Sequence, residues 1–440
     1  MVWPQTRLRY VADLNPSIRV DLLAVPGTEV SFLPMDAIGE FGALNLDKTR
    51  PVAEVRNGYS YFEDGDVAFA KVTPCFENGK GALMGRLEQG AGFGTTEITV
   101  LRPKYRTNAR FLSYVVQSEQ FRQHGVGAMT GAGGLKRVPD EFTRDFSTPW
   151  PVYLEQERIA NFLDDKTARI DALIAEKERL LLALEEWRAA ELTRICFGQD
   201  TAVEDTGNRW IPALPQGWRL VRLKHLVSGI EQGWSPECEA RLAEEDEWAV
   251  LKAGAANGGT FRESEHKALP GHLEPVLDLE VKPGDVLATR ASGSAEYVGS
   301  VAFVYATRPK LMLSDKNFRF KFDKSPPLLP ELLAWMCNTR PLREQILQFV
   351  GGAEGLAKNI GSGNLREIWL AVPPMKEQPR IIILLQERRE QLEKLKHHLD
   401  AHIIRLREYR SSLISAEVTG QLDTNSTTSA SPNENVGPTA

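Results

Sequence analysis

The stretch Leu154-Glu155-Gln156-Glu157-Arg158-Ile159 decides the fold, because the chain repeats it further on as Lys376-Glu377-Gln378-Pro379-Arg380-Ile381. Apolar residues continue at the same spacing, here called the helix offset, so that Ile159 falls on Ile381, Leu163 on Leu385, Ile170 on Leu392, Leu173 on Leu395, Leu184 on Leu406 and Trp187 on Tyr409. The endings match too, since Gly198-Gln199 falls on Gly420-Gln421. Each stretch follows a strand-rich segment of similar length. We interpret the chain as two copies of one unit, a globule followed by a long helix.

The apolar spacing in both helices predicts a coiled coil. The predicted seam consists of Ile159, Leu163, Ile170, Leu173, Leu180, Leu184 and Trp187 in the first helix and of Leu385, Leu392, Leu395, Leu399, Leu406, Tyr409 and Leu413 in the second. A seam this narrow over four to five heptads is typical of paired helices. The alternative is two unrelated amphipathic helices, each packed on its own globule. Two copies fused head to tail favour antiparallel pairing, and forty helical residues reach about 60 Å.

The repeat predicts an α+β fold with pseudo-two-fold organisation. We expect a first globule in residues 1–150, a first spacer helix in 151–198, a linker in 199–207, a second globule in 208–373 and a second spacer helix in 374–423. Residues 424–440 are rich in Ser, Thr, Asn and Pro, which predicts a disordered tail.

Composition excludes several classes of protein. The chain of 440 residues is too long for one core. No apolar run approaches the length of a membrane span, and no secretory signal opens the sequence. Four scattered cysteines fit a reducing cytoplasm and argue against a metal site or a disulfide framework. The net charge is −6, but residues 1–150 carry 17 basic and 17 acidic side chains and are neutral. Charge therefore neither supports nor excludes DNA binding.

Within the globules, short apolar runs predict strands at residues 67–72 and 96–101, and a helix at 110–123. The second globule repeats this order. Its pair Gly284-Asp285 corresponds to Gly65-Asp66, its helix is expected in residues 328–349, and Gly355-Leu356 corresponds to Gly134-Leu135. The spacing between the two Gly-Asp pairs, here called the sheet offset, is slightly shorter than the helix offset, as small loop insertions would produce.

A search for catalytic motifs finds none. The sequence lacks a GxxxxGK[ST] phosphate loop, a methyltransferase motif and an evident nuclease pattern, so we expect no cofactor and no metal. His398 and His402 are four residues apart but lie on the predicted coiled coil, where solvated positions are the simpler explanation. The glycine-rich stretch 131–134 and its counterpart 351–355 form either plain backbone turns or a close approach to a phosphate backbone.

Polar and basic loops next to predicted strands are the remaining candidates for binding. Arg, Lys, Asn, Ser and Thr hold phosphates and contact base edges. We therefore select as candidate DNA-binding residues Lys71, Thr73, Asn78, Lys80, Lys136 and Arg137 in the first globule, and Arg290, Ser292, Ser294, Lys316 and Arg319 in the second. An ordinary surface role remains an alternative for each of them.

These features resemble the specificity subunit of type I restriction–modification systems, over about residues 5–423. The most specific carriers are the helix entries, Pro151 with Glu155-Gln156 and Pro374 with Glu377-Gln378, and the ending 411–423, SSLISAEVTGQLD. The segment 69–81, FAKVTPCFENGKG, looks like one class of target recognition domain. The first helix ends less regularly than the second, as expected where a linker follows.

The resemblance implies that each globule binds one half of a split DNA sequence and that the helices act as a spacer. It also implies a non-catalytic cytoplasmic protein that recruits two methyltransferase subunits and two motor-nuclease subunits. The competing interpretations are a protein–protein scaffold without a DNA role and a stand-alone enzyme. A scaffold would not need polar and basic loops at equivalent positions of both copies, and an enzyme would need a catalytic constellation.

Overall fold

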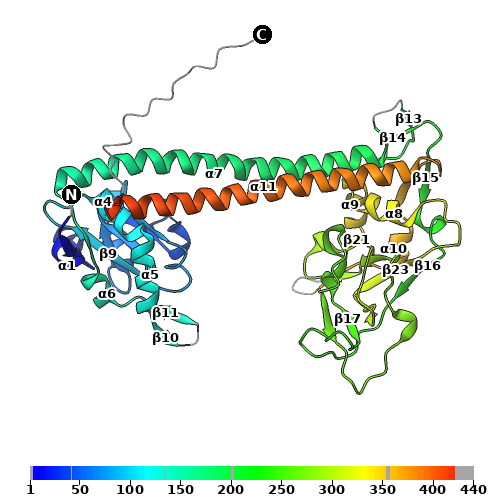
Figure 1. Ribbon diagram of the computed structural model, residues 1–440, viewed down its shortest axis with the longest axis horizontal. Coiled ribbons are helices and arrows are strands. Elements are labelled where there is room, and N and C mark those ends of the chain that lie inside the picture. The colour runs from blue at the N-terminus through cyan, green and yellow to red at the C-terminus, as the bar shows by residue number, and fades with distance from the viewer. Residues whose placement is uncertain (1–2, 41, 133, 200–202, 353–356, 422–440) are drawn as a thin grey trace, which may run out of the picture. The chain divides into compact units, whose positions relative to one another are not determined.

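The structure of the chain is a computed structural model that describes residues 3–40, 42–132, 134–199, 203–352 and 357–421. Its contacts divide the chain into two compact units. Unit 1 combines residues 1–178 with residues 400–440, and unit 2 comprises residues 179–399. Each unit contains one globule and part of both long helices (Figure 1). The predicted tail, residues 424–440, lies outside the described residues.

The globule of unit 1 contains two four-stranded sheets. The first has the order β2-β9-β6-β7 and is antiparallel throughout. The second has the order β4-β3-β8-β5, in which β3 and β8 are parallel. The strands span Ala12–Leu14 (β2), Glu29–Leu33 (β3), Thr49–Pro51 (β4), Ser60–Glu63 (β5), Val67–Ala70 (β6), Gly81–Leu83 (β7), Ala91–Gly94 (β8) and Ile98–Pro103 (β9). All residues of β6 are buried, which explains its continuous apolar sequence.

Unit 2 repeats the first sheet in the same strand order, β16-β23-β19-β21, again antiparallel. The register of the central pair is also repeated, since Val67 opposite Leu101 corresponds at the sheet offset to Val286 opposite Phe320. A second sheet, β18-β17-β22, again includes one parallel pair. The strands span Gly229–Gln232 (β16), Ala249–Leu251 (β17), His266–Ala268 (β18), Val286–Thr289 (β19), Val301–Phe303 (β21), Leu311–Met312 (β22) and Asn317–Lys321 (β23).

The repeated Gly-Asp pair is the turn that enters β6 and β19. Gly65 and Gly284 have φ angles of 92° and 94°, which glycine adopts without a steric penalty. Asp66 accepts a hydrogen bond of 2.8 Å from the backbone N–H three residues earlier, and Asp285 does the same at 2.9 Å. This repeated motif therefore has a structural role.

Each globule has two helices where the sequence predicted one, so that prediction was wrong. Unit 1 has α4 (Ala109–Gln117) and α5 (Glu119–Ala128), and unit 2 has α8 (Pro330–Cys337) and α9 (Arg340–Leu347). Ser118 and Thr339, which have extended backbones, break the helices. The Ser118 hydroxyl donates to the carbonyl of Val115, and the Thr339 hydroxyl donates to that of Met336, each at 2.6 Å. These side-chain hydrogen bonds compete with continuation of the helix.

Short elements complete both globules. In each, a strand near the start of the globule pairs with the strand that precedes the long helix. Two-stranded pairs are β1 (Gln5–Arg7) with β12 (Ser147–Pro149), β15 (Arg219–Arg222) with β25 (Trp369–Val372), β10 (Thr130–Ala132) with β11 (Leu135–Arg137), β13 (Val203–Asp205) with β14 (Ala213–Pro215), and β20 (Ala291–Ser292) with β24 (Lys358–Asn359). Short helices are α1 (Leu8–Val11), α2 (Val20–Ala24), α3 (Val52–Val55), α6 (Asp140–Asp145) and α10 (Ser362–Arg366). Single 3₁₀ turns are η1 (Met35–Ala37), η2 (Glu88–Gly90), η3 (Leu223–His225), η4 (Ala253–Gly259), η5 (Leu277–Leu279) and η6 (Ala295–Tyr297).

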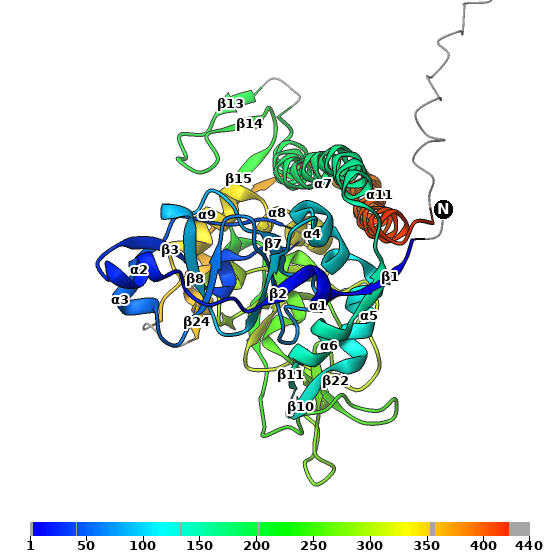
Figure 2. The ribbon, with the colours of Figure 1, turned by 90° about the vertical axis from the view of Figure 1, so that its left-hand side faces the viewer.

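The two long helices, α7 (Tyr153–Cys196) and α11 (Gln378–Val418), contain 44 and 41 residues. At 1.5 Å per residue they extend about 66 and 62 Å. Ion pairs show that they run antiparallel: Arg410 contacts Asp171 at 2.8 Å in unit 1, and Arg388 contacts Glu191 at 3.4 Å in unit 2. Figure 2 shows the pair nearly end on. The predicted antiparallel pairing of the long helices is confirmed.

A buried glutamine fixes the start of each long helix to its globule. Gln156 accepts a hydrogen bond from the N–H of Asn108 at 2.8 Å and donates to the carbonyl of Pro151 at 2.9 Å. Gln378, which is fully buried, accepts from the N–H of Leu329 at 2.7 Å and donates to two proline carbonyls at 2.9 Å. Both glutamines thereby join the long helix to the N-terminus of α4 or α8. The repeated Glu-Gln entry thus has a structural explanation.

The predicted seam is less buried than a complete coiled-coil core. Its outer residues are enclosed, as Ile159 and Leu385 are only 1% and 3% exposed. By contrast, five seam residues further along the helices are about half exposed: Leu173, Leu180, Trp187, Leu395 and Tyr409. Two helices alone enclose only a narrow stripe, so the sides of these residues remain open to solvent.

Each long helix ends on a glycine that packs against a tryptophan. Gly198 and Gly420 have φ angles of 61° and 71°. A Cβ at Gly198 would lie 3.2 Å from the Trp218 ring, and a Cβ at Gly420 would lie 3.0 Å from the Trp3 ring. Both glycines therefore combine a left-handed C-cap with a close approach to an indole.

The core of unit 1 joins the globule to both long helices. One apolar cluster contains Leu8, Phe111, Ile159 and Leu413, and so draws on α1, α4, α7 and α11. In unit 2 the corresponding cluster contains Ile195 from α7 and Leu385 from α11. Neither long helix, nor any other helix in the described parts of the chain, is long and apolar enough to cross a membrane.

Candidate nucleic-acid interface

In unit 1, the candidate loop begins where β6 ends, and backbone hydrogen bonds hold its first residue on both sides. The N–H of Lys71 donates to the carbonyl of Glu97 at 2.8 Å, and the carbonyl of Lys71 accepts from the N–H of Val138 at 2.8 Å. Lys71 is thus fixed between the turn that precedes β9 and the segment that follows β11. Its ammonium group makes no hydrogen bond or ion pair with the described residues.

Unit 2 repeats both hydrogen bonds around Arg290, which follows β19. The N–H of Arg290 donates to the carbonyl of Lys316 at 2.7 Å, and the carbonyl of Arg290 accepts from the N–H of Ile360 at 3.0 Å. Arg290 therefore corresponds to Lys71, and Lys316 corresponds to Glu97, both at the sheet offset. The two units hold a basic residue at the same place in the fold.

A glycine-rich hairpin lies beside this residue in both units. Gly131 has a φ angle of 139°, and a Cβ there would lie 2.4 Å from the carbonyl oxygen of Leu135. Gly352 has a φ angle of 135°, and a Cβ there would lie 2.9 Å from the carbonyl oxygen of Ala357. Both positions require glycine, which favours the interpretation of residues 131–132 and 351–352 as tight backbone turns. Gly355-Leu356, predicted to correspond to Gly134-Leu135, lies outside the described residues.

The hairpin brings further basic residues to each site. In unit 1 these are Lys136 and Arg137 of β11, which are exposed. In unit 2 the residue equivalent to Lys136 is Lys358 of β24, which was not among the residues predicted from the sequence. Its ammonium group donates to the carbonyl of Gly352 at 2.8 Å. The helix offset also relates these two lysines. The predicted correspondence of the glycine stretches uses a spacing one residue shorter than the helix offset, so it does not pair Lys136 with Lys358. Extending the helix offset backwards would have found Lys358.

Hydroxyl side chains connect the loops to the hairpins. The Thr73 hydroxyl donates to the carbonyl of Gly134 at 3.0 Å and accepts from the N–H of Lys136 at 3.0 Å. In unit 2, Ser292 pairs with Lys358 through the β20–β24 ladder, and its hydroxyl accepts from the N–H of Ser294 at 3.3 Å. The predicted residues Thr73, Lys136, Ser292 and Ser294 are therefore brought together with Lys71 or Arg290.

Charge pairing differs between the two sites. Arg137 donates two hydrogen bonds to the carboxylate of Glu97, at 2.7 and 2.8 Å, and these bonds hold the pKa of Glu97 below its usual value. In unit 2, Lys316 replaces that carboxylate and contacts Asp315 at 3.1 Å. Burial raises the pKa of Asp315, but hydrogen bonds from Ser235 and Lys316 outweigh it and lower the pKa. The unit 2 site therefore has an additional cation where unit 1 has an anion.

Two predicted residues lie on the opposite side of β6. Lys80 precedes β7, and its ammonium group donates to the carbonyl of Met35 at 3.1 Å. Asn78 is exposed, and its backbone N–H donates to the carbonyl of Pro74 at 3.0 Å. Lys80 is thus partly engaged within the globule, while the Asn78 side chain remains open to solvent.

The structure corrects the choice of Arg319. Its residue exposure is 3%, and its guanidinium forms ion pairs with Glu231 at 2.5 Å and Asp285 at 3.1 Å. It also donates to the carbonyls of Glu280 and Asp278. The sequence suggested a surface cation because residues 314–319 were interpreted as a polar and basic loop beside a strand, but Arg319 lies within β23. A buried guanidinium held by two carboxylates cannot reach DNA, so it has a structural role.

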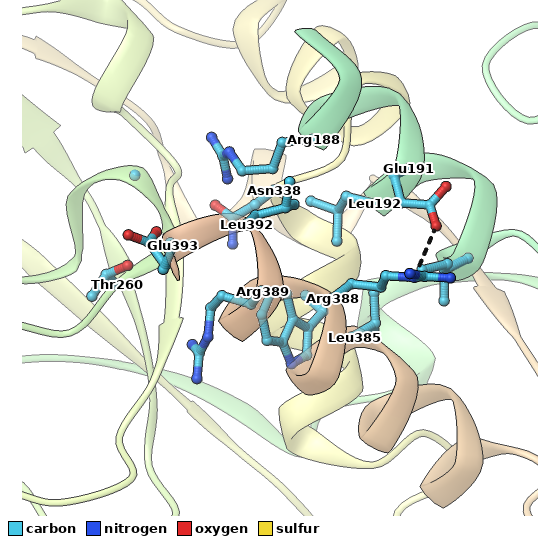
Figure 3. A pocket seen from close by; sticks show the side chains of 14 residues that line it. Arg188, Glu191, Leu192, Thr260, Asn338, Leu385, Arg388, Arg389, Leu392 and Glu393 are labelled. Carbon is cyan, nitrogen blue, oxygen red and sulfur yellow. Dashed lines mark ion pairs between the residues drawn. The ribbon is translucent and has the colours of Figure 1, made fainter. Parts of the chain in front are cut away.

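A pocket in unit 2 shows where the repeat is not kept (Figure 3). It lies among α7, α8, α11 and η4, with Arg188, Arg389 and Glu393 around it. Arg188 and Glu393 correspond at the helix offset to Arg410 and Asp171, which form an ion pair in unit 1. In unit 2, Arg188 instead donates to Glu185 at 2.8 Å. No histidine or cysteine lines this pocket, and no three potential metal ligands come together among the described residues.

Comparison with known proteins gives consistent relatives. The chain is 29% identical over 480 residues to the type I restriction enzyme EcoEI specificity subunit of Escherichia coli, a match that covers 91% of this chain and 80% of the relative. It is 40% identical over 159 residues to the EcoAI specificity subunit of the same species, covering 36% of this chain and 26% of that one. The EcoKI specificity subunit of E. coli strain K12 is 20% identical, and the match covers 73% of this chain and 68% of that one. No family model matches.

Solved structures share the fold. A chain from the structure of an assembled type I R-M system covers 96% of this chain, and 98% of its own length is matched, with a TM-score of 0.73 and 19% identity. The HsdS subunit from Thermoanaerobacter tengcongensis covers 96% of this chain, and 97% of its own length is matched, with a TM-score of 0.52 and 19% identity. Both extend over the two β-rich globules and the long helices.

Proposed function

We propose that this chain, which belongs to the specificity subunits of type I restriction–modification systems, reads its DNA target through one face on each unit. Face 1 comprises Lys71, Thr73, Lys136 and Arg137, and face 2 comprises Arg290, Ser292, Lys316 and Lys358. The chain is a non-catalytic component that recognises the DNA target within the restriction–modification complex. The observation that carries the proposal is the repeated pair of backbone hydrogen bonds around Lys71 and Arg290.

The chemistry of the two faces suits double-stranded DNA. Lysine and arginine neutralise phosphates and release counterions, while arginine, serine and threonine also contact base edges. Equivalent positions carry different residues, for example Glu97 in unit 1 and Lys316 in unit 2. We infer that each face binds a different half of a bipartite target. Asn78, Ser294 and Lys80 are proposed as neighbouring contacts, and Arg319 is left out.

Alanine variants of the two equivalent lysines test the faces. Lys136→Ala and Lys358→Ala should each weaken DNA binding by the reconstituted complex, because each removes a phosphate contact. The slope of log affinity against log salt should decrease by about one unit for each variant. The exposed Lys267 of β18 provides a matched control, and Lys267→Ala should leave the slope unchanged. Equal slopes for all three variants and the parent would refute the assignment of the faces.

We further propose that the long helices bind two methyltransferase subunits. The half-exposed residues Leu173, Leu180 and Trp187 recur at seven-residue intervals on one face of α7. On α11, Leu395 and Tyr409 are also half exposed, and they correspond at the helix offset to Leu173 and Trp187. A heptad stripe suits a partner helix, and its repetition suits two copies of the same partner.

Two motor-nuclease subunits complete the proposed assembly, which we place in the reducing cytoplasm because the four cysteines are unpaired.

Charge substitutions on the stripes test this docking. Trp187→Asp and Tyr409→Asp should each remove one methyltransferase subunit, because a carboxylate would be buried against an apolar partner. The mass of the purified complex measures the number of subunits bound. Glu186→Asp, which changes a neighbouring exposed residue and keeps its charge, is the control. Retention of both methyltransferase subunits in the two aspartate variants would exclude the stripes as the docking surface.

A further inference from the structure

An exposed tryptophan stands beside face 2. Trp234 lies two residues after the end of β16, and 37% of its surface is accessible. Exposed apolar residues are common on protein surfaces, so exposure alone does not indicate a function. The way in which the backbone holds this residue is more informative.

The backbone around Trp234 is closely fitted to the neighbouring strand. Gly233 lies so near the chain that a Cβ would meet the carbonyl oxygen of Leu313 at 2.1 Å. The N–H of Trp234 donates to the same carbonyl at 3.1 Å. The hydroxyl of Ser235 accepts from the N–H of Asp315 at 3.1 Å. The backbone that carries the partly exposed indole is therefore held in place.

The residues that hold Trp234 also belong to the surroundings of face 2. The carbonyl of Asp315 accepts from the side-chain amide of Gln232 at 3.4 Å and from the guanidinium of Arg290 at 3.2 Å. Lys316, a member of face 2, follows Asp315 directly. The turn at Asp315 thus links the segment that carries Trp234 to the cations of face 2.

The equivalent position in unit 1 is used differently. In the repeated sheets, Leu14 opposite Leu101 corresponds to Ile230 opposite Phe320, which aligns β2 with β16. Ile18, four residues after Leu14, therefore corresponds to Trp234, four residues after Ile230. Ile18 packs against an apolar cluster of unit 1, whereas 37% of the surface of Trp234 is accessible. The fold does not require an exposed aromatic residue at this position.

We propose that Trp234 is a DNA-contacting residue of face 2 that supplies an apolar surface for a nucleotide. Its chemistry suits either a thymine methyl group or a deoxyribose ring, both of which are apolar surfaces next to the phosphates. The inference rests on the proposed function of face 2. It adds the first uncharged aromatic contact to that face and has no counterpart at the same position of face 1.

The salt dependence of binding distinguishes this contact from an ionic one. Trp234→Ala should reduce the affinity of the reconstituted complex for its target about tenfold, which corresponds to about 1.4 kcal/mol. The salt slope should not change, because an indole releases no counterions. Trp234→Phe should retain most of the affinity. Lys316→Ala provides the contrast, because it should reduce the slope by about one unit. Tyr105→Ala removes a 90% exposed aromatic residue of unit 1 and should have no effect.

Photocrosslinking gives an independent readout that needs no Trp234→Ala protein. Target DNA with 5-bromouracil in place of thymine in each half-site should crosslink to the peptide that contains Trp234, and Trp234→Phe should lose that crosslink. The inference would be overturned if Trp234→Ala left the affinity unchanged or lowered the salt slope. Face 2 itself would still stand if Lys316→Ala and Arg290→Ala weakened binding. If no substituted position crosslinked, a thymine contact would be excluded. If, in addition, Trp234→Ala bound its target with unchanged affinity, the sugar contact would be excluded as well. Unaltered binding in the Lys316 and Arg290 variants would instead overturn face 2 itself.

Discussion

At the scale of single residues, the paired glutamines show how one side chain connects a long helix to a globule. Gln378 makes three hydrogen bonds, all to backbone groups: the N–H of Leu329 and the carbonyls of Pro327 and Pro373. Without the amide these groups would remain buried and unpaired. Because Gln156 makes the equivalent bonds to Asn108 and Pro151, the same requirement applies in unit 1.

We expect Gln378→Ala to destabilise unit 2 by about 1–3 kcal/mol, the usual penalty for leaving buried partners unsatisfied. The denaturant midpoint of the transition that reports unit 2 measures this loss. Gln391→Ala is the control, because the exposed Gln391 accepts only one hydrogen bond, from Arg388 at 2.9 Å. The explanation fails if the two variants have the same midpoint.

Residue-level prediction from the sequence succeeded where it relied on the repeat and failed where it relied on chemistry alone. The Glu-Gln entries were identified at matched positions, although their bonding partners are backbone groups that leave no mark in the sequence. Arg319 was chosen because it is a cation beside a strand. The two carboxylates that bury it, Glu231 and Asp285, are 88 and 34 residues away in the chain, so its burial could not be read locally.

At the scale of elements, the long helices were predictable because their apolar spacing persists over many turns. The helices of the globules were not, since Ser118 and Thr339 interrupt an apolar pattern that continues across the break. The exposure of Leu173, Leu180 and Trp187 was also missed. Heptad spacing identifies the residues that face a partner, but it does not reveal how many helices surround them.

The helix pair offers a test of the proposed spacer. Removing residues 173–179 from α7 and 395–401 from α11 deletes one heptad from each helix. In the antiparallel pair, 180–186 would then face 402–408, so the seam continues. The spacer shortens by about 10 Å, or about three base pairs at 3.4 Å each. The half-sites also rotate relative to each other, because B-DNA turns once in about 10–10.5 base pairs.

We therefore expect this double deletion either to abolish methylation or to shorten the unspecified gap of the target, with both half-site sequences unchanged. Methylome sequencing of cells that carry the variant measures the gap directly. A single deletion in α7 is the control and should abolish assembly of the pair. A folded variant that methylates the original spacing would show that the helices do not set it.

At the scale of the whole molecule, the repeat was the feature that sequence predicted best. Its offset identified the two globules, the equivalent strands β6 and β19, and the glycine hairpins. What the sequence could not give is the set of residues that the fold gathers at each face. Lys71, Glu97 and Val138 are distant in the chain and meet only through the strand order of the sheet.

The discontinuity of unit 1 has a consequence for synthesis on the ribosome. Small domains usually fold in order from the N-terminus as the chain emerges. Here Leu413, Ile414 and Val418 belong to the same buried cluster as Leu8 and Phe111, so the first globule remains incomplete until these three residues have been made. Unit 2 is one continuous segment, so all of its residues are synthesised before Leu413, Ile414 and Val418 of unit 1. The half of the protein that is translated first is therefore the half that finishes folding last.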